Sequence, residues 1–308
     1  MIRLKLPEAA NPLDWADWLE LVAVVSSEHR SGIAAVERNL KRLSRFDSDR
    51  TIKQISDVEA VCADVSGELD RRAVAAGEAY PFKFEGTELV FSGNIKTHAS
   101  YIFCLCLSWF GWKQRKGNKT FPRRMFEDLS KYAAAAFING EALRFGSPRT
   151  ELPASFKEAL PKLCVLIGEG RVREMSGHVH AQDDSLDLIA WRDFPDRAEG
   201  KLFLVGQCAS GRDWESKKRE LDAEAFFDDW FVDRPPSLRG MRIGFFIPHR
   251  VPRNNWIRVT RRAGIIFDRC RIAYWSHNNA KFTDKKSYAD WSAKTLQVGR
   301  NRRKRKAR

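Results

Sequence analysis

The sequence has few cysteines, and no two of them have the spacing of a zinc-binding pair. None forms the CxxC motif on which many zinc sites depend, and the dense cysteine framework of small secreted domains is also missing. We therefore predict reduced and mostly buried thiols, and we exclude the zinc-finger and disulfide-scaffold classes. The six cysteines are Cys62, Cys104, Cys106, Cys164, Cys208 and Cys270.

Long hydrophobic runs are also absent. The longest, such as residues 101–110, fall well short of the ~20 apolar residues that cross a bilayer, and the first residues lack the hydrophobic stretch of a signal peptide. Hydrophobic residues nevertheless make up 43% of the 308 residues, enough to bury a sizeable core. We expect a soluble, cytoplasmic protein of one large domain or two modest ones.

Acidic residues are fewer than basic residues. Lysine and arginine number 54 against 40 aspartates and glutamates, which gives a net charge of +14. Seven of the positive charges follow Val298, and the rest of the chain is also basic. Such an excess predicts a polyanionic partner, because each contact with a phosphate releases condensed counterions. The alternative is that the basic end is a solubilising or ribosome-adjacent extension.

The first part of the chain has a helical pattern. Apolar residues recur at helical spacing between Pro12 and Ala76, which predicts three packed helices. Two short strands about Glu85-Gly86 follow, and residues 98–112 are typical of a buried helix. The polar, basic segment 113–124 then marks a boundary, which we place near residue 115.

The second part alternates helices and strands, which favours an α/β fold. A helix over Met125–Asn139, capped by Gly140, and another over Pro153–Leu163 come first. Two apolar runs joined by a Pro, Asp and Gly-rich connection then predict a hairpin. The later expected elements are a helix over Trp214–Phe231, a strand over Met241–Pro248, a basic helix over Asn255–Ala263, a strand over Gly264–Phe267, and a further strand that contains Arg269 and Arg271.

Polar residues interrupt this pattern at three places. Asp187 lies in the first run of the hairpin (186–191), where a carboxylate is costly to bury unless it is paired or binds a metal. Gln207 stands near the end of the second run (201–209), so an antiparallel hairpin brings both residues to one end of the sheet. Glu127, on the preceding helix, closes the site from one side. Phosphodiester hydrolysis needs such groups, because acidic side chains hold the Mg²⁺ ions that activate water.

Residues of about 120 to 275 resemble the PD-(D/E)XK nuclease superfamily, the fold of many type II restriction enzymes and bacterial anti-phage effectors. The resemblance implies that Glu127, Asp187 and Gln207 are catalytic and bind Mg²⁺ or Mn²⁺, with Gln207 at the (D/E) position. The lysine of the motif would fall at Ala209 and is absent. Some members carry this lysine on the helix that follows. In this chain the first candidate for that role is Lys217, and the other candidates are Lys218 and Arg212.

The resulting prediction is an α/β protein with a mixed-sheet, restriction-endonuclease-like core at 116–280. A mainly helical region precedes it at 1–115, and a basic tail follows at 281–308. The expected function is metal-dependent DNA cleavage within a restriction or anti-phage system, with DNA and a protein subunit as partners. The alternatives are a catalytically inactive nuclease fold that binds DNA or a partner, favoured by Ala209, and a basic adaptor with no nuclease fold.

Each of these residues also has a structural interpretation. Asp187 caps a turn or pairs with an arginine, Gln207 ends a strand, and Glu127 pairs with Lys131 on the helix surface. A possible metal group of His178, His180, Asp183 and Asp184 is better interpreted as a polar loop. The arginines between Arg250 and Arg262, interleaved with Trp256, are candidates for DNA contact.

Overall fold

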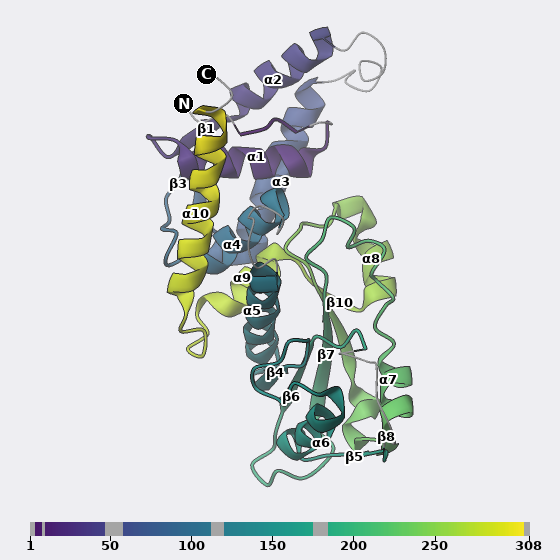
Figure 1. Cartoon of the computed structure of the whole chain (residues 1–308). Helices are drawn as coiled ribbons and strands as arrows, with labels where there is room; N and C mark the ends of the chain where they lie inside the picture. The colour runs from purple at the N-terminus through teal and green to yellow at the C-terminus, as the bar shows by residue number, and fades with distance from the viewer. Residues whose placement is uncertain (1–3, 8–9, 47–57, 112–119, 175–183, 305–308) are drawn as a thin grey trace. The chain divides into compact units, whose positions relative to one another are not determined.

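The structure of the chain is a computed structural model (Figure 1). It describes residues 4–7, 10–46, 58–111, 120–174 and 184–304. It divides into two compact units, residues 1–110 with 284–308 and residues 111–283. The first boundary lies close to the expected one near residue 115. The expected basic tail differs, because its residues 285–304 form a helix of the first unit. No helix of the described residues is long and apolar enough to cross a membrane.

The first unit is mainly helical, as expected, with one small sheet. Three helices occupy the region where three were predicted, and the two predicted strands pair around Glu85-Gly86. Strand β1 was not expected; it pairs antiparallel with β3, so the sheet order is β1-β3-β2. The elements are α1 Pro12–Val25, β1 Arg30–Gly32, α2 Ile33–Phe46, α3 Val58–Ala76, β2 Phe82–Glu85, β3 Glu88–Phe91, α4 Ala99–Phe110 and α10 Lys285–Lys304.

Helix α10 packs on the apolar helix α4. The ring of Phe103 in α4 lies 5.0 Å from the rings of both Tyr288 and Trp291 in α10. Cys104 and Cys106 are fully buried in the same helix, which confirms their predicted place in the core. Burial of the apolar surface of α4 explains why α10 packs within the first unit.

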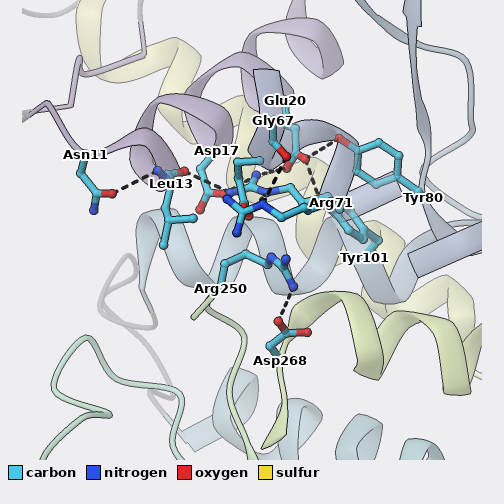
Figure 2. Close-up of polar contacts among 12 residues, drawn as sticks. Asn11, Leu13, Asp17, Glu20, Gly67, Arg71, Tyr80, Tyr101, Arg250 and Asp268 are labelled. Carbon is cyan, nitrogen blue, oxygen red and sulfur yellow. Dashed lines mark hydrogen bonds and ion pairs between the residues drawn. The ribbon is translucent and has the colours of Figure 1, made fainter. Parts of the chain in front are cut away.

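A buried arginine joins helices of the first unit. Arg72 in α3 is fully buried and lies 2.7 Å from Asp17 and 3.0 Å from Glu20, both in α1, and 2.9 Å from Glu68. The hydroxyls of Tyr80 and Tyr101 donate to Glu20 at 2.9 and 2.8 Å (Figure 2). Burial alone would lower the pKa of Arg72, but the three carboxylates outweigh this and raise it well above its ordinary value.

The second unit is a three-layer α/β structure around a mixed sheet of order β10-β9-β7-β6-β4. Strands β4, β6 and β7 pair antiparallel, whereas β7, β9 and β10 pair parallel. A separate two-stranded sheet consists of β5 Arg171–Val172 and β8 Phe231–Asp233. The main strands are β4 Glu141–Arg144, β6 Leu188–Arg192, β7 Leu202–Cys208, β9 Arg242–Phe246 and β10 Ile265–Phe267.

Helices cover both faces of this sheet. Helices α5 (Thr120–Ile138) and α9 (Arg269–His277) pack on one face, where Phe137 contacts both Phe267 and Trp275. Helices α6 (Phe156–Ile167), α7 (Ala223–Trp230) and α8 (Trp256–Ala263) supply apolar residues to the opposite face. The predicted α/β class and the β6–β7 hairpin are therefore confirmed.

Two predicted elements of this unit were wrong. The strand expected to contain Arg269 and Arg271 is helix α9, because Asp268 caps its first turn by accepting from the amide of Arg271 at 3.1 Å. The helix expected from Trp214 starts at Ala223, where Asp222 supplies the cap. The turns before it are closed by bonds three residues apart, such as Lys217 N to Trp214 O at 3.1 Å.

The end of α5 also differs from the prediction. Asn139, not Gly140, adopts the left-handed conformation, with φ of 52°. Gly140 is needed for another reason: a Cβ there would lie 2.1 Å from the carbonyl oxygen of Trp191. Close approach of β6, rather than helix capping, therefore accounts for this glycine.

Candidate metal centre

Asp187 immediately precedes β6, at the edge of the sheet where β7 ends. Its amide donates to the carbonyl of Gly206 at 3.0 Å, and its Oδ2 accepts from the amide of Cys208 at 2.6 Å. The side chain is half-buried, so solvent reaches it. The hairpin therefore fixes this carboxylate at the end of β7, as the sequence predicted.

Glu127 comes to the same place from helix α5. A Cβ on Gly146 would lie 3.1 Å from Asp187 Oδ1 and 3.1 Å from Glu127 Oε2, so both oxygens face this glycine. Gly146 follows β4, and its amide donates to the carbonyl of Asp187 at 2.9 Å. The structure thus brings together two of the three predicted ligands, and the absence of a side chain at position 146 leaves room for them.

Arg144 is the residue of this site that sequence reasoning missed. It is buried at the end of β4, and its guanidinium donates to Glu127 at 3.2 Å and to Asp128 at 3.0 Å. It also donates to the carbonyls of Gly146 at 3.1 Å and Pro148 at 3.0 Å. The sequence signal was an arginine that closes an apolar strand, since a buried guanidinium requires acidic partners. The alternative interpretation of Glu127, a surface pair with Lys131, is wrong, because Glu127 is buried and Lys131 pairs with Glu151.

Burial controls the charge of this site. Desolvation raises the pKa of Glu127 to about 6, against the opposing effect of Arg144. Burial, reinforced by Asp187 and Glu127, also raises the pKa of the Cys208 thiol well above its ordinary value. Near neutral pH, Glu127 is therefore mostly ionised while Cys208 remains a neutral thiol, so the negative charge of the site is carried by carboxylate oxygens.

Gln207 faces a different neighbour. Neighbouring residues of a strand point to opposite faces, and Cys208 lies toward α5, where it contacts Ser130. The Gln207 amide is on the other side and donates to Glu220 Oε2 at 3.0 Å. Glu220 is a further residue that sequence reasoning missed. The structure does not place the Gln207 amide beside Glu127, so its role as a third ligand stays a prediction.

The expected lysines lie on the turns between residues 211 and 221. Lys217 Nζ is 3.6 Å from Glu220 Oε2, the same oxygen that accepts from Gln207. Lys218 is mostly buried and pairs with Glu215 at 2.9 Å. Ala209, where the motif lysine would fall, is buried in an apolar cluster with Trp214 and Val259. A lysine at this position would have to place its charge in the core, so the site does not suit a lysine.

The chemistry of the donors fits Mg²⁺ or Mn²⁺ better than zinc. Magnesium is usually held by one or two carboxylates, with water and substrate phosphate completing its octahedron. Within the described residues no group of three or more His, Cys, Asp and Glu side chains is placed to hold a metal. Of the other residues considered for a metal and interpreted as a polar loop, His178, His180 and Asp183 lie outside those described, and Asp184 accepts from the indole of Trp230 at 2.9 Å.

Comparison with known proteins gives no match to a family model, to a curated protein or to a solved structure.

The pKa of Glu127 makes the stability of the protein depend on pH. Because its folded pKa of about 6 exceeds the ordinary 4.5, the folded state binds more protons between these values, and stability falls as pH rises. We expect the free energy of unfolding of Glu127→Gln to rise relative to that of the natural protein by up to about 2 kcal/mol in total as the pH increases from well below 4.5 to about 7. Urea unfolding in EDTA measures this gap. Glu158→Gln, which removes an exposed carboxylate of α6, is the control, and a gap independent of pH would contradict the assignment.

Proposed function

We propose that this protein is a metal-dependent DNA endonuclease of the PD-(D/E)XK type. The observation that carries the proposal is the approach of the Glu127 and Asp187 carboxylates to Gly146 at the edge of a mixed sheet. The order of elements supports it. Helix α5 carries Glu127, and three strands of the main sheet follow it along the chain as β4, β6 and β7. Asp187 immediately precedes β6, and Gln207 lies near the end of β7. The basic charge of the chain supports a polyanionic substrate.

In this proposal the chain's own groups have distinct tasks. Glu127 and Asp187 would hold Mg²⁺ or Mn²⁺, which would supply an activated water and stabilise charge on the phosphate. The Cys208 amide fixes the orientation of Asp187 by donating to Oδ2, and Arg144 keeps Glu127 in place. Glu220 accepts from the amide nitrogen of Gln207, which places that nitrogen, and not the amide oxygen, on the Glu220 side.

The test is cleavage of supercoiled plasmid by the purified full-length chain with Mg²⁺, with Mn²⁺ or with EDTA. Nicking that depends on the metal is the expected result. A parallel assay with single-stranded RNA distinguishes DNA from RNA as substrate. If no nucleic acid is cut with either metal, including in the presence of co-purifying subunits, the endonuclease proposal fails.

One alternative function has its own observation. Ala209 is buried where the motif lysine is expected, and Glu127 is paired with Arg144, which favours a catalytically inactive nuclease fold that binds DNA or a protein subunit. That alternative predicts DNA binding that does not change when metal is added. Calorimetric titration with Mn²⁺ distinguishes the two, since only the endonuclease proposal requires binding that Asp187→Asn abolishes.

The two lysines of the turn segment are expected to differ. Lys217 shares Glu220 with Gln207, whereas Lys218 is occupied by Glu215 and lies 5.5 Å from the Trp214 ring. We expect Lys217→Ala to lower the cleavage rate by roughly 10²- to 10⁴-fold, the range for loss of a proton-handling group. Lys218→Ala is the matched control. Cleavage rates at several pH values measure the effect, and equal losses in both variants would show that the segment has only a structural role.

A further inference from the structure

Exposed arginines cover helix α8 and the turn that leads into it. Arg258, Arg261 and Arg262 are exposed on the helix, and Arg253 is exposed just before it. Spacings of three and four residues place Arg258, Arg261 and Arg262 on one side of the helix. We call these four residues the arginine face. Val259 and Ala263, on the opposite side, are buried in the core.

The arginine face has little local compensation for its charge. Arg258 approaches Glu215 at 3.5 Å, but Glu215 is closer to Lys218, at 2.9 Å. Arg253, Arg261 and Arg262 make no ion pair within the part of the chain that the structure describes. Like charges four residues apart slightly destabilise a helix. The face thus keeps a concentration of positive charge at a cost to local stability, which indicates a negatively charged partner.

Side-chain contacts link the arginine face to Gln207, the residue predicted as the third ligand of the candidate metal centre. The cluster that holds α8 on the sheet contains Ala209, two residues beyond Gln207, together with Trp214. The turn segment 211–221 connects the two places, since its Glu215 contacts Arg258 and its Glu220 contacts Gln207. A loop contact strengthens this connection: His249 lies 3.0 Å from the carbonyl of Gly211.

Side-chain contacts connect the loop before α8 and the start of α8 to neighbouring elements. Arg250 pairs with the buried Asp268, which also caps α9 (Figure 2). The guanidinium of Arg271 stacks on the ring of Trp256, at 4.6 Å from its centre. These contacts tie the start of α8 to α9 and to the loop before it, so its arginines are held on the folded core of the unit.

We propose that the arginine face binds the sugar-phosphate backbone of DNA that extends from the candidate metal centre. The inference rests on the proposed function for the identity of the polyanion. Guanidinium groups match phosphate oxygens in geometry and remain charged at all relevant pH values. An anionic membrane fits less well, because Ile257 is the exposed large hydrophobic residue of α8 and its other apolar residues face the core.

The test measures binding without catalysis. A fluorescein-labelled duplex of about 30 base pairs is titrated with the full-length protein in EDTA at several salt concentrations, since roughly 0.9 counterions are released for each phosphate contact. We expect Arg261→Gln with Arg262→Gln to lower the slope of log affinity against log salt by about 1.8, and to weaken binding roughly tenfold. The control is Arg192→Gln with Arg239→Gln, which removes two exposed arginines near the opposite edge of the sheet.

The outcomes separate this inference from the proposed function. Equal slopes for the two double variants, or no binding of DNA at all, would overturn the inference even if plasmid is cut. A lowered slope supports it even if plasmid is never cut, in which case only the endonuclease proposal fails. Binding to anionic lipid vesicles that depends on Arg261 and Arg262, without such dependence for DNA, would also overturn it.

Discussion

Replacing Asp187 by asparagine is expected to abolish metal-dependent cleavage of plasmid DNA while the protein remains folded. Asparagine retains an oxygen that can accept from the amide of Cys208, so the bond that holds the end of β7 is kept. It removes the negative charge that the proposed metal requires. Binding to DNA in EDTA is expected to be unchanged or somewhat stronger, because a carboxylate repels phosphate when no metal lies between them.

Two further variants make this prediction specific. Gly146→Ala adds a methyl group 3.1 Å from both carboxylates and is expected to reduce cleavage without removing any charge. Asp196→Ala removes a carboxylate from the β6–β7 connection and is the control for charge alone. Cleavage rates, DNA affinity and circular dichroism are measured for all three. Full activity of Asp187→Asn would show that the two carboxylates have a structural role only.

Replacing Arg72 by methionine is expected to cause the largest loss of stability. The substitution leaves Asp17, Glu20 and Glu68 buried without their shared cation. Breaking a buried ion pair by removing one partner costs about 3–5 kcal/mol. Since whole domains are stable by only about 5–15 kcal/mol, we expect the first unit to be largely unfolded or unfolded at low urea concentration.

The neighbouring arginine offers a matched control. Arg71 also contacts Glu68, at 2.7 Å, but its side chain is 36% exposed. Arg71→Met is therefore expected to cost at most about 1 kcal/mol. Combining Arg72→Met with Glu20→Gln and Glu68→Gln should recover part of the loss, because fewer unpaired charges remain buried. Urea unfolding with limited proteolysis measures each variant, and equal losses for Arg71→Met and Arg72→Met would contradict the assignment.

Much of the fold followed from local patterns in the sequence. Apolar spacing located α1, α3 and α5, and the short apolar runs located the β6–β7 hairpin, because periodicity reflects which face of an element is buried. Helix α9 and the start of α7 were missed for a common reason. Each is preceded by an aspartate whose side chain caps its first turn. Such a side chain can bond the backbone in a helix cap or in a turn, and composition alone does not decide between the two.

The residues of the candidate site were also predictable only in part from the sequence. The sequence by itself determined that Asp187 stands in an apolar run, that Gln207 stands near the end of the next, and that an alanine, Ala209, follows Gln207 by two residues. Only the tertiary structure decided which of these residues meet. Glu127 and Asp187 approach each other across an open position at Gly146, whereas Gln207 turns to Glu220, because the pleat of β7 sends neighbouring side chains to opposite faces.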